Sequence, residues 1–488
     1  MGFQSLPDER GRGVPLRRGK VVGGTSWVTR FAVRGSPADF DAWTRRGCAR
    51  WGFDEVLPWF RRVETDQDFP GAPWHGGDGP MPVTRYRDVP DSAFAAAAMM
   101  ACEGADIAII DDLNRPGAVG VGRMPMTARD GVRVTTADAY LPIEATPAGL
   151  TVLADTIVSE IVVRAGAAQG VRLPDGRVLG AGLVVLCAGV YGSPAVLMRS
   201  GIGPAAHVSE LGVPVVADLP GVGSNLADHP QVWLDPGYGR PAQQRPPLHL
   251  LASFRSSFCG PGQSPDLALW IADPSGDPVE AAIEVLLMTP ASRGSGRLAS
   301  ADPSAPPLIR LPRLDTGSDY ERLAEGLMRA REVAVQPELR AICDRPPTDL
   351  STADRVRAWI GQERYSIPHT IGTCAMSDRP ESGSVVDAHG KVHGIDRLAV
   401  VDASIIPLPP SGFSHIVAIM LAERLSSHLA HATTQPAWHM SPRSLAGTTE
   451  WLAFPQRSDH VGDLHPGWAE LASRASGSWA PIRQRSSI

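Results

Sequence analysis

The run Leu183-Val-Val-Leu-Cys187, followed by Ala188-Gly189, is the stretch that decides the fold. It shows no alternation of apolar and polar residues, which is typical of a strand buried on both faces of an α/β sheet. A helix is predicted over residues 195–200, with Pro194 in its opening turn, because proline fits the first turn of a helix. A strand that leads into a helix in this way indicates an α/β fold.

The rest of the chain predicts further helices and short strands. Helices are expected within residues 37–66, 92–104, 318–335 and 416–429, and strands at 150–154, 157–158, 161–163 and 398–401. Residues 236–265 are rich in Pro, Gln and Gly and are predicted to form a loop. Residues 432–488 have no clear apolar face and are predicted to be a disordered tail.

Composition excludes several classes of protein. The 488 residues carry a net charge of -6, which argues against a nucleic-acid partner because such proteins usually present a basic face. No apolar run reaches the roughly 18 residues of a membrane span, and the N-terminus has no apolar signal segment. The six cysteines are widely spaced and form no zinc motif, so we expect reduced thiols and a cytoplasmic location.

Six segments resemble the glucose–methanol–choline (GMC) oxidoreductase family. Residues 18–43, which contain Gly23-Gly24-Thr25-Ser26, resemble its first signature, and residues 189–203 resemble its second. The other similar segments are residues 131–141, 219–230 (ending in Asp228-His229-Pro230), 369–376 and 400–423. Matches in the family's order from about residue 3 to 430 make this resemblance much more specific than any single motif.

The resemblance implies a mixed α/β fold (α+β), in which an incomplete FAD-binding α/β domain interleaves with an antiparallel-sheet substrate domain. The FAD-binding domain is expected to comprise residues 1–36, 150–232 and 384–431. The lid and substrate-binding domain is expected to comprise residues 37–149 and 233–383.

Two histidines are the predicted catalytic residues. His369 and His415 match the family's two active-site positions, in His369-Thr-Ile-Gly-Thr and in Ser411-Gly-Phe-Ser-His415. Alcohol oxidation needs a base for the hydroxyl proton, and histidine has a suitable pKa. We assign His369 as the base and His415 as its hydrogen-bonding partner, with shared or exchanged roles left open. No metal is expected, because His389 and His393 lie in a predicted turn around Gly390.

The expected cofactor is FAD, and the resemblance places its contacts on short stretches of backbone. The expected cofactor-binding residues are Val22, Gly23, Gly24, Thr25, Ser26, Ile157, Asp402, Ala403, His415 and Ile416. The first five would lie against the cofactor, Ile157 at the adenine end and Asp402-Ala403 at the ribityl or pyrophosphate portion. The N-terminus of the helix after His415 would point its N–H groups toward the cofactor.

The sequence departs from the family at the dinucleotide-binding unit. That unit needs a strand, a Gly-x-Gly-x-x-Gly turn and a helix, and the pairs at 11–13, 120–122 and 221–223 lack the strand or the third glycine. We therefore expect an N-terminally truncated chain that binds FAD weakly or not at all, with a gap or an unpaired edge in its parallel sheet. Thr29 replaces the usual Asn or His, so FAD is expected to be non-covalent.

The function implied by the resemblance is oxidation of a CH–OH group by hydride transfer to FAD. The partners are then a small-molecule alcohol and an electron acceptor that the sequence does not identify. Two alternatives stay open: a truncated non-catalytic homologue, and an enzyme similar to the family's hydroxynitrile lyases, which bind FAD without using its redox chemistry. Anaerobic reduction of the flavin by an alcohol would distinguish the oxidoreductase from both.

Overall fold

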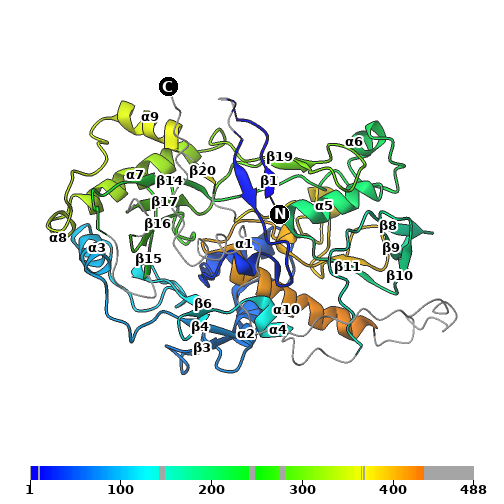
Figure 1. Cartoon of the computed structure of the whole chain (residues 1–488), viewed down its shortest axis with the longest axis horizontal. Coiled ribbons are helices and arrows are strands. Elements are labelled where there is room, and N and C mark those ends of the chain that lie inside the picture. The colour runs from blue at the N-terminus through cyan, green and yellow to red at the C-terminus, as the bar shows by residue number, and fades with distance from the viewer. Residues whose placement is uncertain are drawn as a thin grey trace, which may run out of the picture.

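The computed structural model describes residues 2–8, 11, 13–141, 149–240, 248–274, 281–363, 365–366 and 369–433. Figure 1 shows a mixed structure, with a large sheet on one side and several small sheets on the other. The predicted mixed fold with an antiparallel sheet is confirmed. The predicted tail lies outside the described residues, apart from residues 432–433, which continue the last helix.

The two apolar runs pair as short parallel strands. β11 (Val184–Leu186) lies beside β21 (Leu398–Val400), in the register Val185↔Ala399. β21 is buried throughout, as predicted, but the prediction that β11 is buried on both faces is wrong, because Val185 is 40% exposed. The physical reason is that, in the described part of the chain, β21 is the only strand hydrogen-bonded to β11, so that β11 is an edge strand.

The helix after β11 begins earlier than predicted. α5 spans Gly189–Arg199 and so contains Pro194. Asp402 Oδ2 accepts a hydrogen bond from the Gly189 N–H (2.9 Å) and holds this early N-terminus. Pro194 has no N–H to donate to the Val190 carbonyl four residues before it, and Thr373 Oγ1 donates to that carbonyl instead (2.6 Å). This hydrogen bond, supplied from outside the helix, explains why proline is tolerated there.

Removing the hydrogen bond from Thr373 to the Val190 carbonyl should cause a measurable loss of stability. Thr373→Val removes the hydroxyl with little change in shape and leaves the buried Val190 carbonyl unpaired, which should lower the free energy of unfolding by about 1–3 kcal/mol. In a Pro194→Ala background, the new N–H bonds to Val190 and the same substitution should cost less. Urea unfolding of the four proteins in this double-mutant cycle measures the difference, and equal costs in both backgrounds would contradict the explanation.

The large sheet is antiparallel and has six strands. Its order is β20 (Tyr365–Ser366), β14 (Pro230–Leu234), β17 (Ile283–Leu287), β16 (Leu267–Ala272), β15 (His249–Phe254) and β5 (Gly120–Arg123). Helix α7 (Asp319–Ala334) packs on β17, β14 and β16, and α3 (Ala93–Gly104) packs on β15 and β5. The prediction of a loop over 236–265 is wrong at β15. This segment forms a strand because β16 pairs with it on one side and β5 on the other.

The other strands form small sheets. They are β3 (Glu64–Asp66), β4 (Met81–Thr84), β6 (Met126–Arg129) and β7 (Val132–Arg133); β8 (Glu160–Arg164), β9 (Ala167–Arg172) and β10 (Val178–Gly180); β1 (Gly2–Gln4) and β2 (Pro15–Arg17); β12 (Ile202–Gly203) and β13 (Ala217–Asp218); β18 (Ser295–Arg297) and β19 (Leu308–Arg310). No strand forms over 150–158, contrary to prediction. Val152 and Leu153 stay 43% and 56% exposed, because apolar residues alone do not make a strand without a pairing partner.

The remaining helices are short, except for the last. They are η1 (Gly24–Trp27), α1 (Pro37–Arg45), α2 (Phe53–Val63), α4 (Thr136–Tyr140), α6 (Ala205–Glu210), α8 (Pro337–Arg340), α9 (Ala353–Glu363), η3 (Pro380–Ser382), η4 (Ala403–Ile405) and α10 (Ser414–Thr433). The helices predicted at 92–104, 318–335 and 416–429 correspond to α3, α7 and α10. None of the described helices combines the length and apolar character that crossing a membrane would need.

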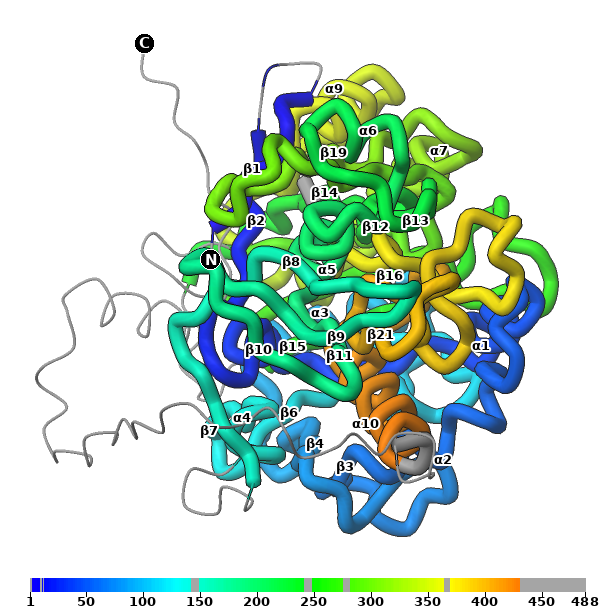
Figure 2. Tube along the Cα trace, turned by 90° about the vertical axis from the view of Figure 1, so that its right-hand side faces the viewer, coloured from blue at the N-terminus to red at the C-terminus, as the bar shows by residue number. Residues whose placement is uncertain are grey.

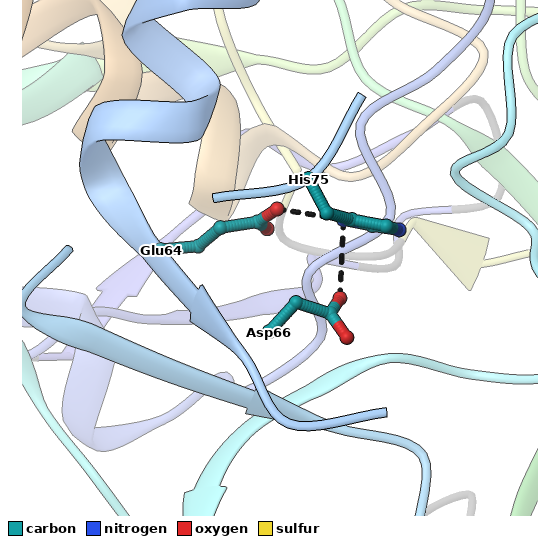
Figure 3. Close-up of side chains that lie close together, drawn as sticks. All are labelled: Glu64, Asp66 and His75. Atoms are coloured by element: carbon teal, nitrogen blue, oxygen red, sulfur yellow. Dashed lines mark hydrogen bonds and ion pairs between the residues drawn. The ribbon is translucent and has the colours of Figure 1, made fainter. Parts of the chain in front are cut away.

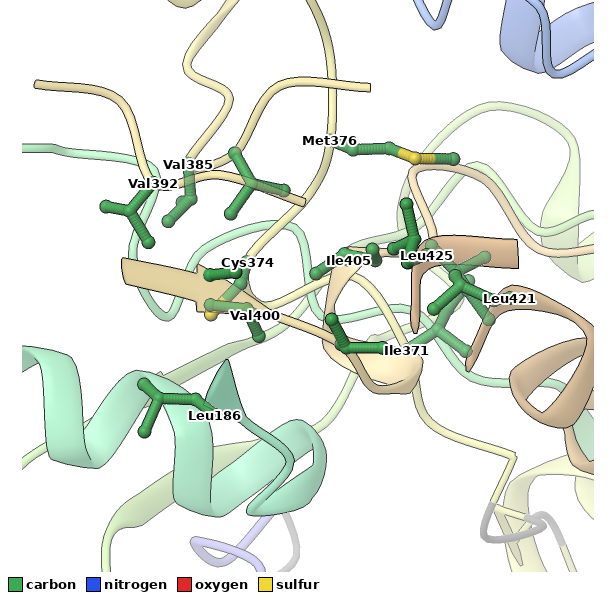
Figure 4. Close-up of a cluster of buried hydrophobic side chains, with 14 of the residues drawn as sticks. Leu186, Ile371, Cys374, Met376, Val385, Val392, Val400, Ile405, Leu421 and Leu425 are labelled. Atoms are coloured by element: carbon green, nitrogen blue, oxygen red, sulfur yellow. The ribbon is translucent and has the colours of Figure 1, made fainter. Parts of the chain in front are cut away.

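Two large hydrophobic cores underlie these layers. One joins β11, β21, α5 and α10 with the loop around Cys374, as Figure 4 shows for Leu186, Val400 and Leu421. The other lies between the six-stranded sheet and its helices. Figure 2 shows β8, β9 and β10 beside β11, at the first core. Helices α1 and α2 also contribute to the first core. The domain boundaries expected from the sequence remain a prediction.

Candidate active site

His369 and His415 come from distant segments that meet near the boundary between the two cores. His369 follows β20. Its backbone N–H donates to Asp228 Oδ1 (3.0 Å), and the same oxygen accepts from the backbone N–H of His229 (2.9 Å), just before β14. His415 is the second residue of α10. The Phe413 ring lies 4.5 Å from the His369 ring, between centroids, and the Phe413 N–H donates to the Val33 carbonyl (2.9 Å). Both predicted histidines are therefore held by neighbouring strands and loops.

Burial keeps these histidines neutral. Each side chain is buried, and burial lowers the pKa of His415 to about 4, helped by the positive charge of Arg133. Burial, and then the charges of His229, Arg18 and His415, lowers the pKa of His369 well below its usual value. His415 acts on the pKa of His369, and Phe413, two residues before His415, contacts the His369 ring. Neutral imidazoles have a free lone pair at neutral pH, so this site can accept protons.

A third histidine, which the sequence reasoning did not select, completes the group. His229 Nδ1 lies 3.2 Å from His369 Nδ1, and the two rings meet edge to face. Burial lowers the pKa of His229 to about 4, against the hydrogen bonds of its ring to the carbonyls of Pro410 and Met288. The signal was present, since His229 belongs to Asp228-His229-Pro230 in one of the family-like segments, but nothing in its spacing linked it to His369.

The predicted cofactor residues 22–26 form a fixed turn with an open side. Gly23 has φ +89° and caps η1, and its carbonyl accepts hydrogen bonds from Ser26 Oγ (2.6 Å) and Thr136 Oγ1 (3.0 Å). A Cβ on Gly23 would lie 3.0 Å from Ala137 Cβ, whereas one on Gly24 would meet nothing within 4 Å. Val22 is 47% exposed. This backbone, fixed behind by α4 and free in front, can lie flat against a planar ligand.

The other predicted cofactor residues differ in how far their side chains are available to a ligand. Both carboxylate oxygens of Asp402 are used by the protein itself: Oδ2 accepts from Gly189 N and Ser193 Oγ (2.5 Å), and Oδ1 from Ser404 N (2.8 Å). Ala403 begins η4 and is half-buried, whereas Ile416 is buried in the first core, so that only its backbone can face a ligand. Ile157 is 42% exposed, and no described contact joins it to the histidines.

A separate polar cluster lies at the end of α2 and on β3, and Figure 3 shows three of its side chains. His75 Nδ1 lies 2.7 Å from Glu64 Oε1 and 3.1 Å from Asp66 Oδ2, and its Nε2 lies 3.0 Å from Asp112 Oδ2. Arg34 pairs with Glu64, and Arg85 pairs with Asp66 (2.8 Å) and Asp112 (2.9 Å). Three carboxylates thus face two guanidinium groups and one imidazole in the protein interior.

This cluster is built as an ion network rather than as a metal site. Each ring nitrogen of His75 lies closer to a carboxylate (2.7 and 3.0 Å) than to a guanidinium nitrogen (3.2 and 3.3 Å), which favours a proton on both. Burial alone would lower the pKa of His75, but its hydrogen bonds to Asp112 and Glu64 outweigh burial and raise it. A bound metal would instead need a bare nitrogen on this ring. The three positive charges then balance the three carboxylates around His75, and Asp68, 3.5 Å from Arg85 Nη1, adds a fourth carboxylate at the edge of the cluster.

Comparison with known proteins gives consistent matches along most of the chain. The N-terminal model of the family described as GMC oxidoreductase matches residues 5–231, and its C-terminal model matches residues 290–422. An uncharacterized GMC-type oxidoreductase of Rhodococcus erythropolis is 33% identical, over 86% of this chain and 84% of the relative. An oxygen-dependent choline dehydrogenase of Brucella melitensis is 30% identical, over 91% and 89%. The crystal structure of pyridoxine 4-oxidase from Mesorbium loti is 29% identical with a TM-score of 0.79, over 88% of each chain.

Proposed function

The chain belongs to the GMC oxidoreductase family, whose members are FAD-dependent enzymes that oxidise alcohols, and we propose from this premise that His369 is its catalytic base. His369 accepts the proton of the substrate hydroxyl, and His415 holds the same oxygen by a hydrogen bond. Bound FAD supplies the hydride acceptor for the carbon-bound hydrogen. The two imidazoles place and deprotonate the alcohol, which favours release of its hydride.

Features of the site support a bound flavin. His415 Nε2 is buried and has no hydrogen-bond partner among the described residues, which is costly unless a ligand supplies one. The open backbone of Val22 to Gly24 and the 47% exposed Trp27 leave an apolar surface uncovered. The first N–H groups of α10, next to His415, have no partner within the helix and favour an electron-rich group. Val22, Gly23, Gly24 and His415 would hold the cofactor.

The contact between His229 and His369 is the observation that carries this proposal. Hydrogen bonding to the backbone carbonyls of Pro410 and Met288 acts on the His229 ring. Since Nδ1 of this ring faces His369, we propose that Nε2 carries the proton for these carbonyls. In a neutral His229, Nδ1 is then an acceptor. His369 must therefore donate its own Nδ1–H across the 3.2 Å contact, and its Nε2 keeps a bare lone pair. His369 is in this way fixed in the tautomer that a base requires.

The direct test is anaerobic reduction of the flavin. The full chain is mixed with excess FAD, a panel of small alcohols is added without oxygen, and the visible absorbance of oxidised flavin is followed. Loss of that absorbance with at least one alcohol, together with formation of the aldehyde or ketone, is the expected result. Cleavage of a hydroxynitrile without flavin reduction would instead support a lyase. Gel filtration of the same mixture tests the expected weak binding of FAD, which would elute apart from the protein.

The role of His229 gives a prediction with a matched pair of variants. His229→Asn keeps an acceptor near the position of Nδ1, whereas His229→Leu removes it and lets His369 adopt either tautomer. We expect the leucine variant to lose about 10- to 100-fold in kcat/KM, as for other partners that orient a histidine, and the asparagine variant to recover much of that loss. Nitrogen-15 NMR of the histidine rings, without FAD, should show the Nδ1–H form of His369 only where an acceptor remains. Equal spectra in both variants would contradict the tautomer argument.

A further inference from the structure

Arg30 is a guanidinium group without a counter-charge among the described residues, and the rings of His249, Phe31 and Phe413 lie between it and His369. It lies between η1 and Phe31, and its carbonyl accepts a hydrogen bond from the Thr127 N–H (2.7 Å). Its side chain points toward the six-stranded sheet, where Nη2 lies 3.3 Å from His249 Nε2 on β15. No carboxylate among the described residues lies within ion-pair distance of Arg30. Burial without such a partner lowers its pKa.

His249 can accept a hydrogen bond from either Arg30 or Trp270, but not from both. Burial, and then the charge of Arg30, lowers the pKa of His249 to about 3, so its ring is neutral and has one lone pair. Two donors approach this ring, the Trp270 Nε1–H at Nδ1 (3.2 Å) and Arg30 at Nε2. At most one of them can be accepted. If Trp270 donates, a ring N–H faces the guanidinium, and Arg30 needs an acceptor from elsewhere.

A second guanidinium adds to the positive potential. Arg133 donates to the Trp27 carbonyl, and burial followed by the charge of Arg30 lowers its pKa to about 10. The Arg133 charge in turn lowers the pKa of His415. Arg133 thus acts on the pKa of His415 and is itself affected by Arg30, whose own charge an anion placed at its guanidinium would balance.

Aromatic rings connect Arg30 with His369. Phe31 follows Arg30 directly, and its ring lies 5.0 Å from His249, 4.9 Å from Trp270 and 5.8 Å from Phe413, between centroids. Phe413 in turn contacts His369 at 4.5 Å. Arg30 faces the antiparallel sheet, whereas the predicted cofactor residues 22–26 lie against α4. This separation assigns Arg30 to the substrate rather than to the flavin.

We propose that Arg30 binds the carboxylate of the substrate, so that the enzyme oxidises alcohols that also carry an acidic group. This inference rests on the proposed function, because it names the substrate class of the same site. A guanidinium binds a carboxylate through charge-assisted and often paired hydrogen bonds. A positively charged alcohol, such as the choline oxidised by the Brucella relative, would be repelled by Arg30.

A binding test avoids any dependence on FAD. Benzoate and the neutral benzamide are titrated into the full chain, and heat of binding and tryptophan fluorescence are recorded. We expect benzoate to bind at least about 10-fold more tightly than benzamide, because a hydrogen bond to a charged group is stronger. Arg30→Gln should remove that preference, Arg30→Lys should keep part of it, and Arg129→Gln, an exposed arginine at the end of β6, should leave it unchanged. Circular dichroism shows that each variant is folded.

A turnover experiment separates this inference from the proposed function. With excess FAD and an artificial acceptor, para-hydroxymethylbenzoate should be oxidised at least about 10-fold more efficiently than benzyl alcohol, and only the former should depend on Arg30. Equal efficiency for both alcohols, or equal binding of benzoate and benzamide, would overturn the anionic substrate class and leave the oxidoreductase. Benzoate binding that depends on Arg30, without oxidation of any alcohol, would support the carboxylate site and overturn the proposed function.

Discussion

Replacing His369 by Gln should lower kcat/KM for the alcohol by about 10²- to 10⁴-fold, which is the usual contribution of a general base. The reason is that the amide side chain keeps a hydrogen-bonding group but cannot accept a proton at neutral pH. The measurement is flavin reduction under single-turnover conditions, with flavin retention as a control for cofactor binding. His415→Asn keeps the hydrogen bond to the substrate oxygen, so it should lose less activity than His369→Gln.

The pH profile gives this prediction a second readout. The pKa of His369 is lowered well below its usual value by burial and by the charges of His229, Arg18 and His415. The free base is therefore already present across the neutral range, and kcat/KM should be flat there and fall only in acid. A rise in activity through pH 6 to 7, about the ordinary histidine pKa, would show that His369 is not the base or is not desolvated. An unchanged rate in His369→Gln would exclude it outright.

Replacing His75 by Gln should lower the free energy of unfolding by about 3–5 kcal/mol, as expected when one member of a buried charge network is removed. Glutamine can donate to one carboxylate, but it leaves Glu64, Asp66 and Asp112 facing only the two positive charges of Arg34 and Arg85. Urea or thermal unfolding measures the loss. His389→Gln, in an exposed turn, is the matched control and should change stability little.

The same network makes the stability depend on pH, with a definite sign. The pKa of His75 is raised in the folded protein, above the value of about 6.5 expected when unfolded. Its contribution is then complete below that unfolded value and is lost as the pH rises through the folded pKa. The difference between the native protein and His75→Gln should therefore shrink in alkaline solution. Chelators should not change the unfolding temperature, and a chelator effect reversed by a divalent metal would contradict the ion network.

The local sequence pattern was sufficient to predict a helix or strand wherever the residues of that element alone determine its structure. The helices α3, α7 and α10 follow from apolar spacing, and β21 follows from its uninterrupted apolar run. The failures share one cause, which is that a distant partner decides the outcome. α5 begins at Gly189 because Asp402 and Thr373 supply its hydrogen bonds. β15 forms because β16 and β5 lie beside it, and residues 150–158 form no strand because they have no such neighbour.

The same division holds at the site. The sequence alone determined the family and predicted the two histidines, because their motifs are local and occur in a fixed order. Only the tertiary structure placed His229 against His369, left Arg30 without a carboxylate among the described residues, and paired His75 with Glu64 and Asp66 of β3 and with the distant Asp112. A proton position or an unbalanced charge depends on what lies within a few ångströms, and residues far apart in the chain supply those neighbours.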